Sequence, residues 1–351
     1  MEKPSNAPTR KVVIHRAGSY DRLKIESQPR REPKPGEVEV EVRAIGVNYA
    51  DVVVRMGLYA SAREFVGWPI TPGFEVAGVV TAVGRGVTDH RPGDRVFAVT
   101  LFDGYATRVT VPSHQVFALP EGMSFVQGAA FPVVFLTAYF ALHVLAHPRR
   151  GDRVLVHSAA GGVGGALVQL LRRAECEVTG VVGGSHKVAA AEELGCDHVI
   201  DKSSEDLWAR AEAISERGFD VVLDANGVAT LGESYAHLRP AGKLVIYGFA
   251  TMMPKKGGRP NYLKLAVDYL RTPRYNPLDL TNDSKSILAF NLSYLFDRSD
   301  ILDEAMRDLS AWLAEGVITP PTATTYRFED VAKAHADIES GRTIGKLVLE
   351  P

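Results

Sequence analysis

Hydrophobic and polar residues follow two different patterns along the chain. From residue 11 to about residue 119, short apolar stretches are separated by turns, and residues 37–42 (EVEVEV) alternate strictly between charged and apolar. Such alternation predicts a strand with one face in solvent. The Pro35-Gly36 pair has the order that suits a type II turn. This region is predicted to be a mainly antiparallel barrel or sandwich. Further strands are predicted at residues 76–80 and 95–99.

From about residue 128 the pattern becomes an alternation of strands and helices. Residues 129–146 are apolar at helical density, and the apolar strand at 153–157 is followed by a glycine-rich turn. Continuous apolar strands that alternate with helices are typical of a parallel sheet covered on both faces. The second region is therefore predicted to be a doubly wound α/β domain. Its other strands are predicted at 177–182, 198–200, 220–224 and 243–247, and its helices at 166–173, 187–194 and 205–215.

The chain returns to the first pattern near its C-terminus. An amphipathic helix is predicted at residues 301–315 and a strand at 345–349. A strand that follows the doubly wound unit indicates that the last segment completes the first domain. We therefore expect a β-rich domain made of residues 1–128 plus 289–351, with residues 129–288 inserted as the α/β domain.

A basic segment at residues 255–274 fits neither pattern. It has many Lys and Arg side chains, and Leu263, Val267 and Leu270 have the spacing of an apolar stripe on a helix. Three interpretations remain open: a solvent-exposed loop, a surface that recognises a carrier or coenzyme A, and a contact with an anionic membrane. The stripe would cover either the mouth of a substrate pocket or a partner.

Composition excludes several classes of protein. The 351 residues include 40 basic and 42 acidic side chains, and a net charge of −2 gives no general attraction to nucleic acid. The two cysteines, Cys176 and Cys196, are too few for a disulfide framework or a four-cysteine zinc site. The first nine residues lack the apolar core of a signal peptide, and the apolar stretch at 154–171 is interrupted by glycines. We expect a cytoplasmic protein with no integral membrane segment.

The strongest local motif is the turn at residues 159–164 (AAGGVG), between an apolar strand and a helix. It matches the dinucleotide-binding pattern with Ala in place of the first Gly. Glycines there allow the backbone to approach a pyrophosphate and the helix to pack closely on the strand, and the N–H groups at the helix N-terminus attract the phosphate. Cofactor contacts are predicted at Ala160, Gly161, Gly162, Val163 and Gly164.

The end of the second α/β strand favours NADPH over NADH. Enzymes that use NAD commonly have an acid there, which binds the adenosine ribose. This chain instead has Gly183, followed by Ser185 and Lys187, whose hydroxyl and ammonium groups suit the 2′-phosphate of NADP. Lys202, after the next strand, adds a second predicted cation. The alternative is that Lys187 only begins a solvent-exposed helix.

Several further motifs are spread over nearly the whole chain: residues 44–59 (AIGVNYADVVVRMGLY), 71–78 (TPGFEVAG), 93–96 (GDRV), 131–139 (FPVVFLTAY), 157–164 (HSAAGGVG) and 345–349 (GKLVL). With these motifs the chain resembles the medium-chain dehydrogenase/reductase superfamily, specifically its zinc-free quinone oxidoreductase branch. Residues 291–295 (NLSYL) are most similar to the vesicle amine transport protein-like quinone reductases. The resemblance implies a GroES-like catalytic domain with an inserted Rossmann domain, and a homodimer.

The resemblance also implies that no metal is bound. Zinc-dependent relatives have Cys where this chain has Asn48, and His where it has Phe74. Phe74 cannot bind zinc, and Glu75 alone does not make a tetrahedral site. Alcohol oxidation in those relatives needs a Lewis acid. We therefore expect an NADPH-dependent reductase that transfers hydride to a quinone or to the C=C bond of an α,β-unsaturated carbonyl.

The family pattern places Asn48 and Tyr59 beside the nicotinamide as candidate catalytic residues. Asn48 would donate a hydrogen bond to a carbonyl that gains negative charge, and Tyr59 would donate a proton or anchor the substrate. The alternatives are that Asn48 only caps a turn, that Tyr59 packs on the surface, and that water supplies the proton. Asn226 has no assigned role. The resemblance implies further cofactor contacts at Thr137, Tyr247, Gly248, Phe249, Phe290, Asn291, Leu292 and Lys346.

Two other functions remain open. A trans-acting enoyl reductase for carrier- or CoA-bound intermediates of secondary metabolism would share this chemistry, and it would reduce a crotonyl thioester but not a quinone. A non-catalytic protein would bind NADPH tightly without turning over any quinone or enone.

Overall fold

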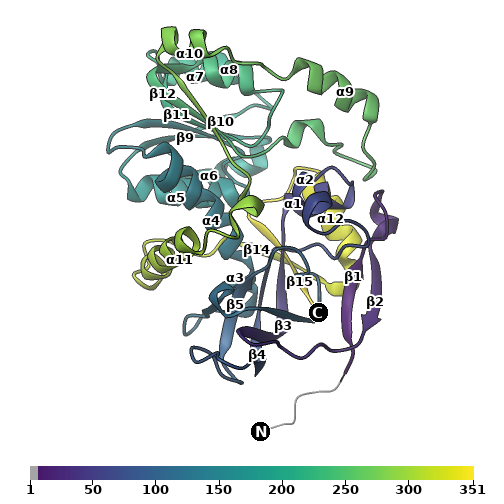
Figure 1. Cartoon of the computed structure of the whole chain (residues 1–351). Helices are drawn as coiled ribbons and strands as arrows, with labels where there is room; N and C mark the ends of the chain where they lie inside the picture. The colour runs from purple at the N-terminus through teal and green to yellow at the C-terminus, as the bar shows by residue number, and fades with distance from the viewer. Residues whose placement is uncertain (1–6) are drawn as a thin grey trace.

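The computed structural model describes residues 7–351, which form two lobes with a sheet in each (Figure 1). The lower lobe contains a sheet with the strand order β14-β15-β3-β4-β5-β7, and β6 pairs with the N-terminal half of β3. A separate two-stranded ladder, β1–β2, lies beside it. The strands are β1 (Thr9–Val13), β2 (Lys24–Gln28), β3 (Glu37–Val47), β4 (Glu75–Val83), β5 (Arg95–Val99), β6 (Arg108–Pro112), β7 (Val116–Ala118), β14 (Ala323–Arg327) and β15 (Lys346–Glu350).

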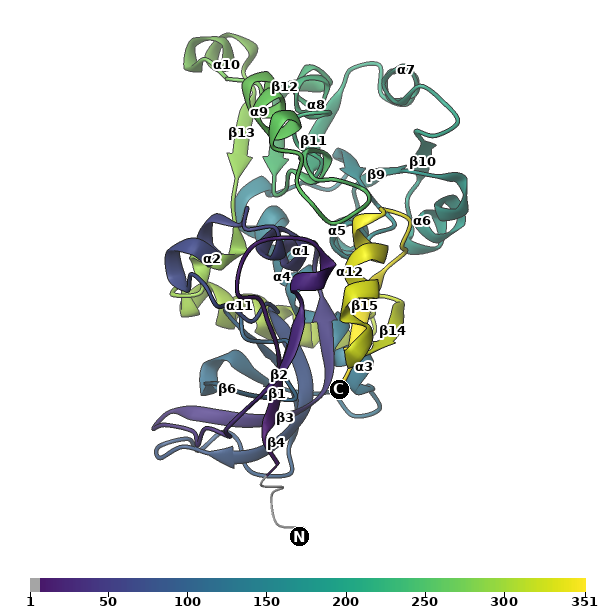
Figure 2. The same cartoon turned by 90° about the vertical axis from the view of Figure 1, so that its right-hand side faces the viewer.

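The C-terminal strand belongs to this first sheet, as the sequence predicts. β15 pairs antiparallel with β3, with Leu347 opposite Val47, and β14 pairs parallel with β15. The chain therefore leaves the lower lobe after β7 and returns to it at the end. Figure 2 shows β14, β15 and α12 (Val331–Glu339) together on one side of this lobe.

One residue of the alternating strand differs from the prediction. Val38, Val40 and Val42 are buried as expected, but Glu39, predicted to face solvent, is fully buried. The guanidinium group of Arg30 covers it and donates two hydrogen bonds, of 2.8 and 2.7 Å, to its carboxylate. A paired, hydrogen-bonded charge can be buried where an isolated one cannot.

The upper lobe is the predicted doubly wound domain, with six parallel strands in the order β10-β9-β8-β11-β12-β13. Alternate residues of β8 face opposite sides: Val154 and Val156 pack toward α4, α5 and α11, whereas Leu155 packs toward α7 and α8. Both faces of the sheet are thus covered, which explains the continuous apolar strands. The strands are β8 (Arg153–His157), β9 (Glu177–Val182), β10 (His198–Asp201), β11 (Phe219–Asp224), β12 (Leu238–Ile246) and β13 (Ser286–Ala289); the helices are α4 (Pro132–Tyr139), α5 (Gly162–Arg173), α6 (Val188–Leu194), α7 (Leu207–Ile214), α8 (Leu231–Ala236) and α11 (Ser299–Ala314).

A long apolar helical segment connects the lobes. It runs through α3 (Phe125–Ala130), α4 and a π-helical turn (Phe140–Ala146), and α3 packs on β3 and β4 while α4 packs on α5 and α11. Within residues 7–351 it is the one helix long and apolar enough to cross a membrane, and 72% of its most apolar stretch is buried inside the protein. Its apolar character is therefore that of a core helix.

After β12 the chain makes an excursion before it returns as β13. Residues 250–260, which we call the strap, lead to α9 (Tyr262–Arg271) and then α10 (Pro277–Asp283). Figure 1 shows α9 set apart from the body of the upper lobe. The predicted apolar stripe is on this helix and faces solvent, with Leu263 77% and Leu270 73% exposed. Leu265, on another face, packs against Val52 and Met253.

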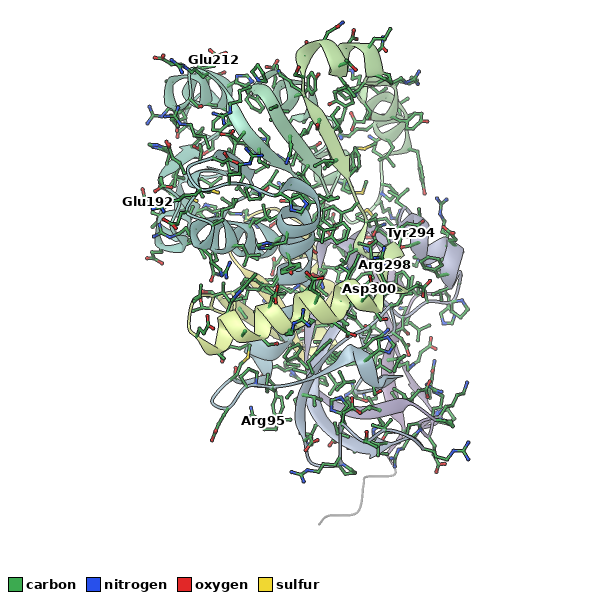
Figure 3. The ribbon with its side chains drawn as sticks, turned by 60° about the vertical axis from the view of Figure 1, so that its left-hand side comes forward. Arg95, Glu192, Glu212, Tyr294, Arg298 and Asp300 are labelled. Carbon is green, nitrogen blue, oxygen red and sulfur yellow. The ribbon has the colours of Figure 1, made fainter. Side chains whose placement is uncertain are left out.

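Three further segments surround the junction of the lobes. α1 (Tyr49–Arg55) and α2 (Ala60–Phe65) follow β3, and a short 3-10 helix (Leu292–Leu295) follows β13. Figure 3 shows Tyr294 and Arg298 close to one another at the level where the lobes meet. Arg298 is held there by two hydrogen bonds to Asp300.

We predict that Gly164→Ala destabilises the protein. A Cβ at this position would lie 2.2 Å from the Ser158 carbonyl oxygen and 2.8 Å from the Ala159 Cα, so helix α5 must move away from the strand. The expected loss is about 1–3 kcal/mol in the free energy of unfolding, measured by urea denaturation.

Gly232→Ala is the matched control, because no atom lies within 4 Å of its added Cβ and the residue is inside helix α8. We expect this substitution to be neutral or stabilising by up to about 1 kcal/mol. Equal unfolding midpoints for the two variants would contradict the prediction.

Candidate functional site

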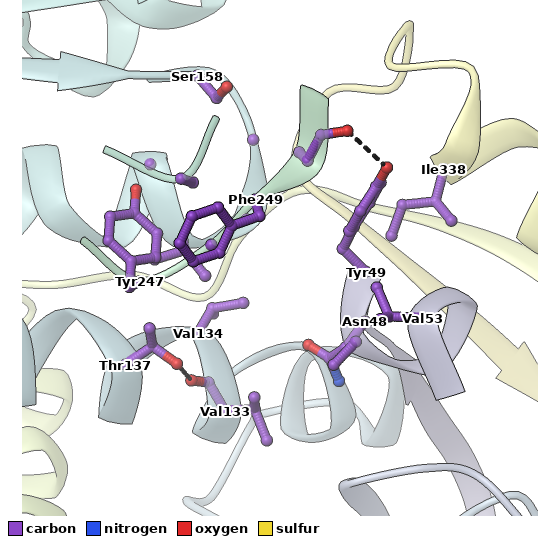
Figure 4. Close-up of a pocket in the computed structure, with 18 of the residues that line it drawn as sticks. Asn48, Tyr49, Val53, Val133, Val134, Thr137, Ser158, Tyr247, Phe249 and Ile338 are labelled. Atoms are coloured by element: carbon purple, nitrogen blue, oxygen red, sulfur yellow. Dashed lines mark hydrogen bonds between the residues drawn. The ribbon is translucent and has the colours of Figure 1, made fainter. Parts of the chain in front are cut away.

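A cavity of about 1390 Å³ lies between the lobes, and residues from both lobes line it. Figure 4 shows part of its wall, where Asn48 and Tyr49 of the lower lobe lie opposite Tyr247 and Phe249 of the upper lobe. Of the nineteen residues that the sequence predicts for the site, the structure places all except Ser185 in the lining. The sequence motifs are therefore brought together in one place by the fold.

The glycine turn forms one wall and fits a phosphate group. Gly161 is the N-cap of α5, and the first helical N–H to find a partner is that of Gly165, which donates to the Gly161 carbonyl at 2.8 Å. The N–H groups of Gly162, Val163 and Gly164 form no hydrogen bond within residues 7–351. Three free N–H groups at the start of a twelve-residue helix attract an anion. The turn lies between β8 and β11, where the strand order reverses, which is the usual place for a dinucleotide.

A backbone contact ties this turn to the lower lobe. The Gly345 N–H donates to the Ala160 carbonyl at 2.9 Å, and Gly345 and Gly161 form a parallel bridge. Gly345 has φ +64°, and a Cβ there would lie 2.2 Å from the Thr322 carbonyl oxygen, so this position needs glycine. The contact places the next residue, Lys346, inside the cavity.

Asn48, Glu75 and Lys346 form a buried network, of which Asn48 and Lys346 line the cavity. Lys346 Nζ donates to Asn48 Oδ1 and lies equally close, at 2.5 Å, to Glu75 Oε1, while Asn48 Nδ2 donates to Glu75 Oε1 at 2.8 Å. Both polar atoms of the Asn48 amide are therefore fixed by opposite charges, and one N–H of its NH₂ group is left for another acceptor. Asn48 is also the N-cap of α1, the alternative that the sequence left open, and its amide lines the cavity as well.

Lys346 lines the cavity, and the structure gives it two partners that the sequence did not predict. Its ammonium group contacts Asn48 and Glu75, and only its stem passes near the glycine turn, with Cδ 3.7 Å from the Cβ position of Gly162. No local pattern could predict this network, because its three members are separated by up to 298 residues.

The positions of the expected zinc ligands are occupied by this network and by aromatic packing. Phe74 contacts the rings of Tyr59 and Phe102, with ring centroids 5.9 and 5.1 Å away. The second carboxylate oxygen of Glu75 accepts from the Val133 N–H at 2.8 Å, and Lys346 balances its charge. Within residues 7–351 no group of three or more His, Cys, Asp and Glu side chains is arranged to hold a metal ion.

Tyr59 is half-buried at the junction of the lobes, not packed on the surface. Its hydroxyl group donates to Asn291 Oδ1 at 2.8 Å and lies 3.0 Å from Ser293 Oγ. Burial is the main cause that raises the Tyr59 pKa, so the phenol stays protonated and can donate a hydrogen bond. Asn291, predicted as a cofactor contact, is thereby connected to the candidate catalytic tyrosine.

The predicted 2′-phosphate residues are only partly together. Lys187 and Lys202 line the cavity, and Lys187 Nζ donates to the Gly341 carbonyl at 2.8 Å. Burial is the main cause that lowers the pKa of both lysines, and Lys202 lowers that of Lys187 further. Ser185 points elsewhere: its hydroxyl donates to Asp201 Oδ2 at 2.5 Å.

Other predicted contacts form the remaining walls. The Thr137 hydroxyl donates to the Val133 carbonyl at 2.7 Å (Figure 4), so it offers a ligand only its lone pairs. Tyr247 and Phe290 lie with their rings nearly parallel and their centroids 6.4 Å apart. The lining also contains Gly183, Gly248, Phe249 and Leu292 as predicted.

Sequence reasoning missed several lining residues. Asn226 is buried and its Nδ2 forms no hydrogen bond within residues 7–351, while its Oδ1 accepts from Ser158 at 3.4 Å. Ser158 has φ +59°, a left-handed conformation that is rare outside glycine. Only the position of Ser158 directly before the glycine turn could have identified it. The other missed lining residues include Tyr49, His186, Lys255 and Arg342.

A buried chain of polar groups lies behind Asn48. Asp51 accepts hydrogen bonds from the Asn48 and Gly73 N–H groups and from Tyr105, whose hydroxyl lies 3.2 Å from His335 Nε2. Complete burial raises the pKa of Asp51 to about 7, although these donors and Lys346 oppose the shift. Burial also lowers the pKa of His335 well below its ordinary value.

We predict that Asp51→Asn changes the pH dependence of stability. Because the pKa of Asp51 is higher in the folded than in the unfolded protein, folding binds a proton near neutral pH. The stability contributed by protonated Asp51 is therefore present at low pH and lost as pH rises through about 7. The lowered pKa of His335 makes stability rise with pH, but this contribution is present in both the wild type and the Asp51→Asn variant.

Urea denaturation of wild type and variant at several pH values between about 5 and 8 measures this effect. The stability of the wild type relative to the variant should fall by about 1 kcal/mol per pH unit between pH 5 and 7. Parallel curves for the two proteins would show that Asp51 is ionised throughout.

The fold and site together define a two-lobed dehydrogenase or reductase with its dinucleotide turn facing a buried polar network. Comparison with known proteins agrees with this class. Residues 34–121 match the model of the alcohol dehydrogenase GroES-like domain, and residues 194–349 match the model of the zinc-binding dehydrogenase domain. The synaptic vesicle membrane protein VAT-1 homolog of Rattus norvegicus is 36% identical over 346 residues, which are 98% of this chain and 84% of that protein.

Two solved structures are similar over the whole chain. The quinone oxidoreductase of Escherichia coli, complexed with NADPH, superposes with a TM-score of 0.83 at 28% identity and covers 98% of this chain and 100% of its own. The CurK enoyl reductase gives a TM-score of 0.82 at 27% identity, with 98% and 99% covered. The chain belongs to the medium-chain dehydrogenase/reductase superfamily, in the branch that includes the VAT-1 homologues and quinone oxidoreductases, and it is an oxidoreductase of that branch.

Proposed function

We propose that this protein is a zinc-independent, NADPH-dependent reductase of quinones or α,β-unsaturated carbonyl compounds. The observation that carries the proposal is the shared cavity, in which the free N–H groups of the glycine turn and the Asn48 amide face the same space. The relatives solved with NADPH support the choice of coenzyme. When bound, the reduced nicotinamide supplies a hydride to an electron-poor carbon.

The residues of the chain divide the binding of NADPH among them. Gly162, Val163 and Gly164 offer N–H groups to the pyrophosphate, and Lys187 and Lys202 offer positive charge to the 2′-phosphate. Thr137 and Tyr247 line the part of the cavity that faces Asn48 (Figure 4), where the nicotinamide would lie, and the ring of Phe290 lies beside that of Tyr247.

Asn48 is proposed to stabilise negative charge on the substrate. Lys346 holds the amide oxygen of Asn48 and Glu75 holds its Nδ2, and the second N–H of Nδ2 can donate to a carbonyl or quinone oxygen. Because the amide is already oriented, no reorganisation is needed when charge develops on that oxygen. The positive charge of Lys346 also stabilises negative charge on the substrate oxygen, but Lys346 does not donate a proton to the substrate.

Tyr59 is proposed to anchor the substrate and to supply a proton. Its phenol is protonated and rests between Asn291 and Ser293, so it can donate to a substrate oxygen or carbon that displaces one of these partners. Water remains the alternative proton source. Across a reduced C=C bond, the β-carbon gains the hydride and the α-carbon gains this proton.

The absence of zinc is part of the proposal and has its own support. Phe74 has no ligand atom, and Lys346 holds Glu75 through an ion pair at 2.5 Å. A divalent cation there would have to displace a buried ammonium group and would meet no second anionic ligand among Asn48 and Phe74. Stoichiometric zinc in the purified protein would contradict this part.

NADPH oxidation with a panel of acceptors tests the function. The panel contains p-benzoquinone, phenanthrenequinone, methyl vinyl ketone and crotonyl-CoA. We expect turnover with at least one quinone or enone, a roughly 100-fold lower kcat for Asn48→Ala, and a smaller loss for Tyr59→Phe. The Kd for NADPH, measured by fluorescence titration, should be unchanged in Asn48→Ala because this residue faces the acceptor.

The other outcomes separate the alternatives. Turnover of crotonyl-CoA alone would favour the enoyl reductase of carrier-bound intermediates, a function that the similarity to CurK and the large cavity also support. Tight NADPH binding without any turnover would favour a non-catalytic protein. Full rates in both variants would remove Asn48 and Tyr59 from the mechanism.

A further inference from the structure

The strap (residues 250–260) crosses the cavity from one lobe to the other and is held at both ends. At its start, the Ala250 N–H donates to the Ala225 carbonyl at 3.0 Å, and Thr251 donates its N–H and hydroxyl to the Asn226 carbonyl at 2.9 and 2.7 Å. Tyr49 of α1 also donates to the Ala250 carbonyl at 3.3 Å, as Figure 4 shows. The first anchor of the strap is therefore the loop after β11.

The second anchor is a buried ion pair of the lower lobe. Arg55 and Glu339 form an ion pair at 2.9 Å, and both side chains are fully buried. Both bind the backbone of Gly258: Arg55 donates to the Gly258 carbonyl at 3.2 Å, and the Gly258 N–H donates to Glu339 at 3.0 Å. Ser19 donates to the Gly257 carbonyl at 2.8 Å. Gly258 has φ +65°, and a Cβ would lie 2.9 Å from the Tyr20 ring, so the strap fits closely here.

Lys255 lies between these anchors and lines the same cavity as Lys187 and Lys202. It forms no ion pair or side-chain hydrogen bond in the described part of the chain, and neither does the ammonium group of Lys202. The two charges are close enough that Lys255 lowers the pKa of Lys202. The stem of Lys202 lies over the end of β9, with Cε 3.8 Å from the Cβ position of Gly183.

No acid forms an ion pair with these three lysines in the described part of the chain, although Asp224 is near enough to raise the pKa of Lys202. The carboxylate of Asp201 accepts hydrogen bonds from Ser185 and Ser203, and that of Asp224 accepts them from Thr230, Ser234 and two backbone N–H groups. The cavity wall thus presents three ammonium groups from three different segments. Their mutual repulsion is relieved when a doubly charged anion binds between them.

We propose that Lys255 is a specificity-determining residue for the 2′-phosphate of NADPH, which it reaches from the strap. This inference rests on the proposal that NADPH is the coenzyme. It adds that the basic segment at residues 255–274 contributes to the recognition of its 2′-phosphate. The 2′-phosphate site is then built from the segments that follow β9 and β10 and from the strap, more than 50 residues further along the chain. The neighbouring Lys256 has a similar charge and exposure but does not line the cavity, so it is a matched control.

Nucleotide fragments test the site without any catalytic step. Isothermal titration of adenosine 2′,5′-bisphosphate, adenosine 3′,5′-bisphosphate and 5′-AMP is carried out with wild type, Lys255→Ala and Lys256→Ala. We expect Lys255→Ala to weaken the 2′,5′-bisphosphate roughly five- to tenfold and to change 5′-AMP less than twofold. Lys256→Ala should leave both affinities unchanged.

Each other result has a distinct meaning. If the wild type binds the 2′,5′-bisphosphate no more tightly than 5′-AMP, the proposed coenzyme fails and the inference fails with it. If the wild type discriminates and Lys255→Ala discriminates equally well, only the role of Lys255 is overturned. Equal losses in the two lysine variants would show general surface charge, and a Lys255-dependent preference for the 3′,5′-bisphosphate would indicate a CoA-type phosphate; either result overturns the proposal.

Discussion

The return of the C-terminal strand to the first sheet is the constraint on which the site depends. β15 pairs with β3, and just before it the Gly345 N–H binds the Ala160 carbonyl of the glycine turn. One short segment therefore belongs to the first sheet and touches the glycine turn that follows β8 of the second. This double contact joins the two lobes at the cavity that the turn and the Asn48 amide share.

The same segment carries the charge that organises the buried network. Lys346 is the first residue of β15, and its ammonium group holds both Asn48 and Glu75. Burying a single carboxylate or ammonium group costs free energy of desolvation. Here the ion pair between Glu75 and Lys346, and their hydrogen bonds to the Asn48 amide, offset that cost. The network thus gives the cavity a fixed donor while using only side chains of the lower lobe.

Local patterns were sufficient to predict most of the fold. The strands β5, β8 and β9 have the predicted bounds, because each is a short apolar run with turns on both sides. The glycine turn was recognisable because its chemistry is contained within six consecutive residues. The site residues that depend on packing between distant segments were harder: the burial of Glu39 needs Arg30, and the position of Lys346 needs Glu75. Hydrophobic periodicity contains no information about such pairs.

The turned-away hydroxyl of Ser185 has a consequence for the evolution of coenzyme choice. An acid, Asp201, lies at the end of β10, the strand beside β9, and its carboxylate accepts hydrogen bonds from the hydroxyl groups of Ser185 and Ser203. A chain that lost those two hydroxyl groups would leave the Asp201 carboxylate with the Ser203 backbone N–H as a donor and one oxygen open to a ligand. Such a chain would need few further substitutions to bind the ribose hydroxyl groups of NADH in place of the 2′-phosphate of NADPH.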